Sequence, residues 1–252
     1  MVQNREYRLS ICMSKVKLQI RIPQSLSDIT LEQYQKYVKV LDGIDKDGET
    51  ASEFLNLKAL EIFCGLELKE SYKLPISMFD DVIYKLAECL NEDTPLIKRF
   101  WFRGSNGVEV EFGLHPDLQN LTSGEYFDLD NYINDFQDMH KAMAVLYRPI
   151  TASKGDYYEI EEYEGTDKYA GYMKYAPVNV AIGARLFFYR LGMKLSKHTI
   201  ASSLKEMSPE ERLQVESKFL EQNGVGINHF MHSLEGMSQD LMKLQNLASI
   251  SV

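Results

Sequence analysis

The amino-acid sequence predicts a mainly α-helical protein with small β elements, which is an α+β fold. Apolar residues recur at helical spacing through most of the 252 residues, and strict alternation of apolar and polar residues is confined to short stretches. Several of the helical segments also begin with residues that cap helices. The expected order is a helical N-terminal unit, a central β-hairpin and then long C-terminal helices.

The N-terminal unit is expected over residues 15–95. It opens with KVKLQIRIP (15–23), in which apolar side chains alternate with polar ones up to a proline, the pattern of a half-buried strand. A second methionine, Met13, is a more plausible beginning for an ordered protein than the first. Residues 1–14 are therefore predicted to be disordered, or to be an extension that does not belong to the native protein.

Three helices are expected to follow this strand. Thr30 and Gln33 have the spacing of a capping box, and Gly43 is placed to end the first helix. Residues 51–66 repeat apolar residues at helical spacing, and Ser77 is the expected cap of the third helix. The strand and the three helices are expected to form one small unit.

The second domain is expected over residues 96–252. It begins with RFWFRGSNGVEVEFGL (99–114), a hairpin whose GSNG turn contains the residues that tolerate positive φ. Thr122 and Glu125 form a second capping box at the start of a helix. A short acidic stretch at 157–165 predicts a strand at a sheet edge. Helices are expected to fill the remainder of the domain.

The stretch DFQDMHKAMAVLYRPI (135–150) raises the question of a metal or catalytic cluster. Asp135, Asp138 and His140 are close in sequence, but on a helix His140 points roughly opposite Asp138. A metal site needs three or four converging ligands, whereas the apolar residues of this stretch share one helical face. We therefore predict a core-facing helix that exits at Arg148, because the residue before a proline resists helical geometry.

Two further patterns imitate ligand sites. In DGIDKDGE (42–49), the register of a calcium loop would place Gly43 and Phe54 where carboxylates are required. His229 and His232 are three residues apart with no third ligand nearby in sequence, so a pair on a helix surface is favoured. No motif of a nucleophilic or phosphate-binding enzyme occurs. The sequence thus predicts no catalytic, cofactor-binding or metal-binding residue, no cofactor, and a protein that is not an enzyme.

Composition and charge narrow the class of partner. The net charge of −9 argues against nucleic acid, because binding to phosphate backbones needs clustered Lys and Arg. An odd and sparse set of three cysteines suggests a reducing compartment. The most apolar stretch, 178–195, contains Asn179 and three Lys or Arg residues, so no membrane span is expected.

The C-terminal third has a surplus of apolar side chains. A helix that begins at Pro177 is apolar nearly all round over 178–195, which indicates burial in the core or cover by a partner. Ser208 and the following proline are a strong start for a further helix, and a last amphipathic helix spans about 227–247. Burial in one α-rich core is the alternative to partner binding. The candidate partner-binding residues are Phe187, Phe188, Leu191, Phe230, Met231, Leu234 and Met237.

Several segments resemble proteins of tailed bacteriophages, including phages that infect gut Bacteroidetes. They are IPQSLSDITLEQYQKY, FWFRGSNGVEVEFGLHPDLQNLTSGEYFDLDNY and MHKAMAVLYRPI, within a similarity that spans residues 15–190. The most specific parts of this resemblance are the region from Leu121 to Tyr126 and the run from Met139 to Ile150.

The resemblance implies a product of a phage morphogenesis module, and no catalytic residue comes with it. It implies a tail assembly chaperone that holds apolar segments of a tail protein, or alternatively a virion structural protein such as a ring subunit at the portal and tail junction. An enzyme of unknown type is the remote alternative. The implied partners are phage tail or connector proteins and further copies of the chain itself. The implied location is the host cytoplasm during phage assembly or, alternatively, the virion.

Overall fold

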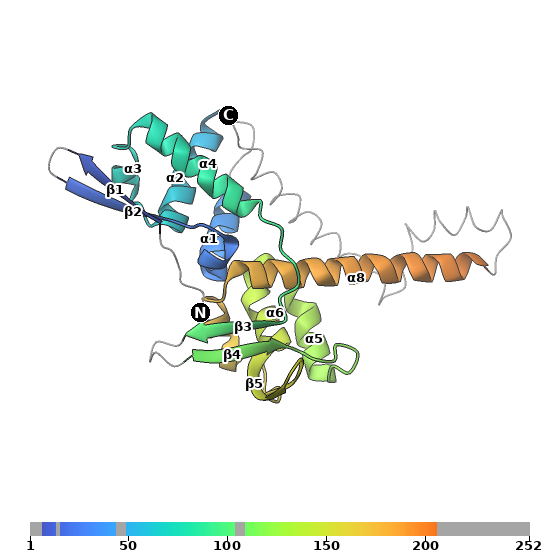
Figure 1. Cartoon of the computed structure of the whole chain (residues 1–252). Helices are drawn as coiled ribbons and strands as arrows, with labels where there is room; N and C mark the ends of the chain where they lie inside the picture. The colour runs from blue at the N-terminus through green and yellow to red at the C-terminus, as the bar shows by residue number, and fades with distance from the viewer. Residues whose placement is uncertain (1–6, 14–15, 44–48, 104–108, 206–252) are drawn as a thin grey trace.

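The computed structural model describes residues 7–13, 16–43, 49–103 and 109–205. Helices make up 56% of the described residues, and a small antiparallel sheet of four strands accompanies them. The predicted α+β class is therefore confirmed. Figure 1 shows two groups of elements, one above and one below the base of a long helix.

The upper group in Figure 1 contains the N-terminal elements, a two-stranded hairpin beside several helices. The strand predicted at residues 15–23 is confirmed as β2, and the second helix ends before Gly65, which adopts a φ of +67°. The elements are β1 Tyr7–Met13, β2 Val16–Ile22, η1 Leu26–Asp28, α1 Leu31–Asp42, α2 Glu49–Cys64, α3 Leu68–Ser71 and α4 Ile76–Leu90.

Strand β1 differs from the expectation of disorder in residues 1–14. Tyr7–Met13 pair antiparallel with β2, with Tyr7 opposite Ile22 and Met13 opposite Val16. The stretch YRLSICM itself alternates apolar residues with Arg8 and Ser10, which is the signal of a strand. The expectation of disorder is therefore wrong for residues 7–13. The alternative, that residues 1–14 are an extension that does not belong to the native protein, stays a prediction.

Both predicted capping boxes are present. The backbone N–H of Gln33 donates to Thr30 Oγ1 at 3.2 Å, and the Gln33 side chain accepts from the Thr30 backbone N–H at 3.0 Å. Thr122 and Glu125 make the same reciprocal pair of hydrogen bonds at the start of α5. These local bonds satisfy backbone donors that the first turn of a helix leaves unpaired.

The third predicted helix begins earlier than its expected cap. Pro75, not Ser77, is the N-cap of α4, and its carbonyl accepts from the N–H groups of Met78 and Phe79 at 2.9 and 3.0 Å. Ser77 lies inside the first turn. The proline restricts the φ angle where the chain enters the helix, and the N-cap makes no side-chain hydrogen bond to the first turn.

The lower group in Figure 1 contains a sheet with strand order β3-β4-β5-β6, flanked by short helices. The predicted hairpin at 99–114 is confirmed, with Arg99 opposite Gly113, and β6 is the edge strand expected within 157–165. The elements are β3 Arg99–Arg103, β4 Glu109–Leu114, α5 Ser123–Tyr132, η2 Phe136–Asp138, α6 Met139–Leu146, β5 Tyr147–Lys154, β6 Tyr157–Ile160 and α7 Asp167–Met173.

Helix α6 confirms the core-facing helix predicted within 135–150. Met139 and Met143 are fully buried, as are their apolar neighbours on this helix. The helix ends at Leu146, earlier than the expected exit at Arg148, and Tyr147 already has extended backbone angles. Arg148 lies opposite Gly113 in the pairing of β5 with β4, so strand pairing ends the helix before the proline does.

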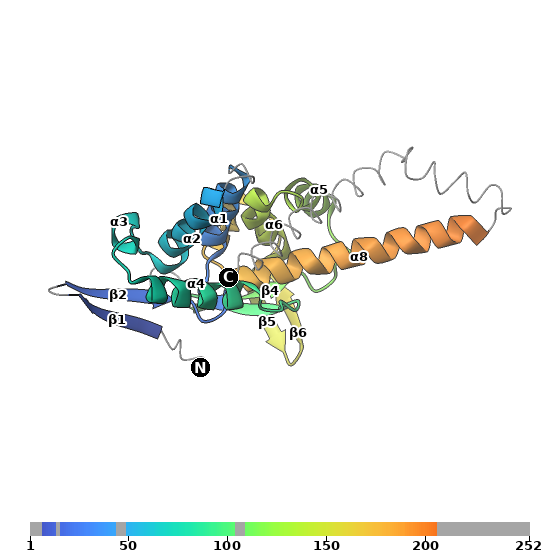
Figure 2. The ribbon, with the colours of Figure 1, turned by 90° about the horizontal axis from the view of Figure 1, so that it is seen from above.

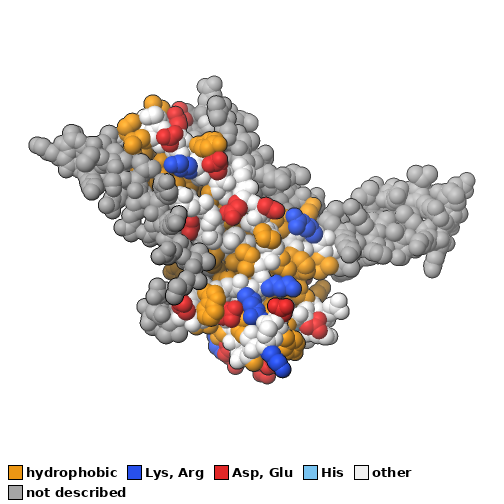
Figure 3. Space-filling view, viewed as in Figure 1, with side chains coloured by type: hydrophobic (Ala, Val, Ile, Leu, Met, Phe, Trp, Pro, Cys, Tyr) orange, Lys and Arg blue, Asp and Glu red, His pale blue; other side chains and the backbone are white. Residues whose placement is uncertain are grey.

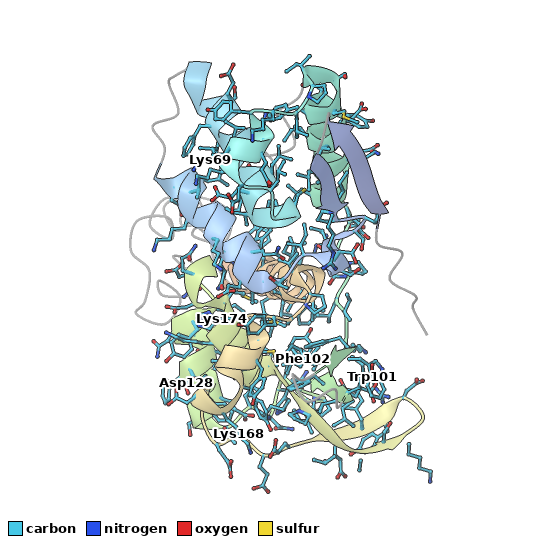
Figure 4. The ribbon with its side chains drawn as sticks, turned by 90° about the vertical axis from the view of Figure 1, so that its left-hand side faces the viewer. Lys69, Trp101, Phe102, Asp128, Lys168 and Lys174 are labelled. Carbon is cyan, nitrogen blue, oxygen red and sulfur yellow. The ribbon has the colours of Figure 1, made fainter. Side chains whose placement is uncertain are left out.

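Backbone hydrogen bonds join the two groups of elements. The first two N–H groups of α1, those of Leu31 and Glu32, donate to the carbonyls of Ala176 and Lys174 at 2.9 and 2.8 Å. The N–H of Val178 donates back to Ile29 O at 2.9 Å. Figure 4 shows Lys174 where the two groups meet, and one continuous hydrophobic core draws residues from both.

The longest described helix is α8, Val178–Lys205, which confirms the helix predicted to begin at Pro177. Figures 1 and 2, viewed at right angles, both show it running out beyond the rest of the described fold. The helices predicted from Ser208 and over 227–247 lie outside the described residues. Within the described residues, none of the helices combines the length and the apolar character needed to cross a membrane.

Candidate partner-binding surface on the long helix

Helix α8 divides into two parts, which we call the root (residues 178–185) and the projecting half (residues 186–205). The root is anchored in the core between the two groups of elements, where it packs against η1, α1 and α6. Its apolar side chains are buried; Ile182 is 8% exposed, and the other four are each at 1% exposure or less. Those four are Val178, Val180, Ala181 and Ala184.

Two residues fix the position of the root. A Cβ atom on Gly183 would lie 2.4 Å from the carbonyl oxygen of Pro95, so only glycine allows the connector before β3 to approach this closely. Arg185 is buried, donates from Nη2 to the carbonyl of Asn134 at 2.7 Å, and places its guanidinium 5.3 Å from the ring centre of Phe136. The root therefore cannot slide without breaking specific contacts.

The projecting half begins with a turn that is only partly covered. Leu186, Phe188 and Tyr189 pack against the core, whereas Phe187 and Leu191 do not belong to that core cluster. Leu191 is 37% exposed, and the rings of Phe187 and Phe188 meet edge to face with centres 5.4 Å apart. Figure 3 shows hydrophobic side chains gathered at the level where α8 leaves the body.

The sequence predicted seven partner-binding residues, and the structure describes three of them. Phe187 and Leu191 are one helical turn apart and thus share a face, with Phe188 beside them. The remaining predicted residues lie outside the described part of the chain; they are Phe230, Met231, Leu234 and Met237. The described surface of this site is therefore a short apolar stripe at the start of the projecting half.

The acidic and histidine residues of 135–150 are engaged separately. Asp135 Oδ1 accepts from the N–H of Gln137 at 2.8 Å, and Asp138 pairs with Lys141 at 2.8 Å. His140 Nδ1 lies 3.2 Å from Gln35 Nε2, which also donates to two backbone carbonyls. Burial, assisted by neighbouring lysines, lowers the pKa of His140. Asp135, Asp138 and His140 thus each bind a different neighbouring group, and they do not converge on one point where a metal ion could bind.

A buried ion pair links α5 to β5. Arg148 Nη2 donates to Glu125 Oε1 at 2.6 Å, and both side chains are less than 5% exposed. The other guanidinium N–H groups donate to the carbonyls of Val145 and Glu161 at 3.0 and 2.7 Å. Because the donors of Arg148 bind groups of the fold itself, this pair fits a structural role.

The groups around the ion pair also bind within the fold. Burial alone would raise the pKa of Glu125, but hydrogen bonds from Thr122 and Arg148 outweigh it and hold that pKa below its usual value. His115 Nε2 lies 3.7 Å from Glu125 Oε1, and burial lowers the pKa of this histidine. Tyr163 covers the guanidinium of Arg148 and donates to Asp128 at 2.5 Å. Figure 4 labels Asp128 in the lower of the two groups of elements.

A groove of about 590 Å³ between α1 and α2 was not anticipated from the sequence. Its lining includes Lys36, Lys39 and Lys58 and the apolar side chains of Val40 and Ile62. Two of the lysines already form ion pairs along their own helices, at 3.2 and 2.6 Å to glutamates. The spacing of Lys36 and Lys39 on α1 could have indicated one side of this groove. The other side could not be predicted from the sequence, because it forms only when α2 packs beside α1.

Exposed aromatic residues are a second feature that the sequence did not single out. Trp101 is 63% exposed on β3, while its neighbour Phe102 turns inward against Phe112 and Tyr172. Figure 4 shows Trp101 towards the outer side of the sheet and Phe102 towards its interior. Strand alternation carries this signal, because RFWFR places the two rings on opposite faces.

Within the described residues, no three His, Cys, Asp or Glu side chains lie together as a metal site would require. Comparison with protein-family models, with curated proteins and with solved structures finds no match for this chain.

Proposed function

We propose that this protein is a non-enzymatic assembly factor of a tailed bacteriophage, of the tail assembly chaperone type, that holds an apolar segment of a tail protein. The observation that carries the proposal is the apolar stripe of Phe187 and Leu191 on a helix that leaves the body. A rigid root followed by a partly uncovered apolar face suits a helix that presents contact residues to another protein.

The physical reason for binding lies in the burial of this stripe. Removing a leucine or phenylalanine side chain from water contributes about 1.5–3 kcal/mol when the burial is complete. Leu191 and Phe187 would gain part of this on contact with an apolar helix of a partner. An assembly chaperone needs a contact of this kind, strong enough to cover a client segment and weak enough to release it when the client polymerises.

The class of partner comes from the resemblance to phage morphogenesis proteins. The resembling segments supply α1, the β3–β4 hairpin, α5 and α6, so they include much of the framework in which the root is anchored. This supports a tail or connector protein as the partner, and the host cytoplasm during assembly as the place of action.

The second candidate function is a virion structural protein, such as a ring subunit at the portal and tail junction. One observation favours it: a long helix with a fixed root and a projecting half can pack between neighbouring copies in a ring. In that case the apolar stripe is buried against another copy of the chain, and the protein resides in the virion.

Mass spectrometry of purified particles and of the infected-cell lysate tests the two candidates. A chaperone is abundant in the lysate and absent from particles, whereas a ring subunit is present in particles at a fixed copy number. In a pull-down from the same lysate, the variant Phe187→Asp/Leu191→Asp should lose its partner. Phe187→Leu/Leu191→Met, which keeps the stripe apolar, is the matched control and should retain it. Equal capture by both variants contradicts the proposed role of the stripe.

A further inference from the structure

The groove between α1 and α2 has a positively charged lining in a chain whose net charge is −9. The described part of this lining contains three lysines and one glutamate, together with Gln33 and the half-buried side chains of Val40 and Ile62. The charged residues are Lys36, Lys39, Lys58 and Glu61. The groove therefore combines apolar side chains with an excess of positive charge.

The positive charge of this lining is only weakly compensated within the fold. Lys36 forms an ion pair with Glu32 at 3.2 Å. Lys58 forms one with Glu61 at 2.6 Å. Ion pairs at the surface are weak, so carboxylates of a partner can take the place of these glutamates. Lys39 is exposed and forms no ion pair with the described residues. The chemistry that complements the groove is therefore acidic.

Apolar contacts are available beside the lysines on both helices. Phe54, Lys58 and Ile62 follow one another at intervals of four residues, so they lie in one row along α2. Phe54 is 43% exposed, and its ring centre lies 5.8 Å from Lys58 Nζ. On α1, Val40 is half-buried and lies outside the core cluster. A partner can therefore bury apolar side chains here and pair its carboxylates with the lysines.

The walls of the groove are the flanks of two helices rather than helix ends. Backbone N–H groups in a helix flank are bonded along the helix, whereas phosphate sites use the free N–H groups of a helix N-terminus. Gln33 Nε2 donates to Ile62 O at 2.9 Å and links α1 to the last turn of α2. A phosphate group would use the lysines alone and leave the apolar side chains without a match. This favours a protein segment that is both acidic and apolar.

The dimensions of the groove fit a short length of helix. Its lining along α1 runs from Gln33 to Val40, which is two helical turns or about 10 Å. Over that length, one face of a helix presents apolar side chains at positions i, i+3 or i+4, and i+7. The volume of about 590 Å³ lies within the range of ligand pockets, about 300–1,000 Å³. Two turns of an amphipathic helix therefore match the groove in length.

We propose that the groove between α1 and α2 is a docking site for an acidic amphipathic helix of a partner protein. The apolar face of that helix lies against Val40 and Ile62. Its Asp and Glu side chains pair with Lys36, Lys39 and Lys58. The inference goes beyond the proposed function, because it concerns a surface on the N-terminal elements and does not depend on the apolar stripe of α8.

Fluorescence anisotropy with a defined peptide tests the proposal on the full-length protein. The probe is a labelled peptide of about 18 residues, long enough to form a helix in water, with Leu on one face and Glu on both sides of that face. Its twin has Lys in place of every Glu. The net charge of −9 alone favours the lysine peptide, so only local docking reverses that order. We expect the acidic peptide to bind at least about tenfold more tightly than its twin at about 0.15 M salt.

Variants locate the binding. Lys36→Glu/Lys39→Glu should weaken binding of the acidic peptide at least about tenfold and strengthen binding of its twin. Lys69→Glu/Lys73→Glu makes the same change in net charge on exposed lysines outside the described lining, and both affinities should stay within about twofold. Figure 4 labels Lys69 in the upper group of elements. Val40→Gln changes no charge and should weaken the acidic peptide about fivefold by removing an apolar contact.

Several outcomes would overturn the proposal. One is equal affinity of the acidic peptide for the wild type and for Lys36→Glu/Lys39→Glu, and another is a preference of the wild type for the lysine peptide. Binding of a DNA oligonucleotide through Lys36 and Lys39 in place of the peptide would assign the groove to nucleic acid. Self-association that the double variant abolishes would assign it to a second copy. The comparison of the two peptides on the wild type needs no variant, so it decides even if a variant fails to fold.

Discussion

The root and the projecting half of α8 belong to one helix and are similarly rich in apolar residues, yet they have different surroundings. Ala181 and Ala184 in the root are fully buried, whereas Leu191 in the projecting half is 37% exposed. The difference comes from other parts of the chain, namely the Pro95 carbonyl against Gly183 and the Asn134 carbonyl bound by Arg185. An apolar helix therefore predicts that a face will be covered, but not which surface covers it.

The sharpest test of this comparison places one aspartate in each part. Ala181→Asp puts an unpaired charge where the side chain is fully buried, and the cost is comparable to the whole stability of a domain, about 5–15 kcal/mol. We expect the cooperative unfolding transition in urea to disappear. Leu191→Asp should change the free energy of unfolding of the body by about 0.5 kcal/mol, mainly through helix propensity. Loss of the transition in both variants would place the projecting half in the core.

A second substitution measures how much stability is lost when a buried contact outside α8 is broken. Arg148→Met removes one partner of the buried pair and leaves the Glu125 carboxylate buried without its guanidinium, which should cost about 3–5 kcal/mol. Lys141→Met breaks the exposed pair with Asp138 and should cost at most about 1 kcal/mol. Urea unfolding at pH 7 measures both. Similar costs for the two variants would contradict the structural role of the buried pair.

Features that depend on neighbouring residues could be predicted from the sequence, whereas features that depend on contacts between distant parts of the chain could not. The capping boxes at Thr30 and Thr122 and the hairpin at 99–114 depend on residues within a few positions, and all three are confirmed. The end of α6 at Leu146 depends on strand pairing with β4, more than thirty residues earlier in the chain. The division of α8 into two parts likewise depends on the connector near Pro95.

The candidate site shows the same limit. Helical periodicity identified the apolar residues of α8, and the spacing of Phe187 and Leu191 was enough to place them on one face. Periodicity alone could not distinguish these two residues from Leu186 and Phe188, which pack against the core. The groove between α1 and α2 required two helices to be docked side by side. Such information is tertiary and is not contained in the pattern of a single helix.

A smaller effect tests how closely the root is held. Gly183→Ala introduces a Cβ atom 2.4 Å from the Pro95 carbonyl oxygen, and the required backbone shift should cost about 1–3 kcal/mol. Gly171→Ala in α7 is the matched control, because a Cβ there meets nothing within 4 Å. That variant should gain up to about 1 kcal/mol from helix propensity. A lower melting temperature for Gly183→Ala and a higher one for Gly171→Ala would confirm the close approach. An equal rise in melting temperature for both variants would contradict it.

The smallest expected effect is a pH dependence that arises at His140, where α6 meets α1. His140 faces Gln35, Asp138, Lys141 and Lys174 near the junction of the two groups of elements. Burial, with the charges of both lysines, lowers the pKa of His140 below the 6.5 of an exposed histidine. As pH falls through 6.5, the unfolded chain takes up a proton at this position before the native protein does. The native state should therefore lose stability progressively between pH 6.5 and the lower native pKa, and no further at more acidic pH.

His140→Gln should flatten this part of the profile in urea unfolding between pH 7.5 and 5. An unchanged slope would assign the dependence to His115, which lies beside Glu125 and whose pKa is also lowered by burial.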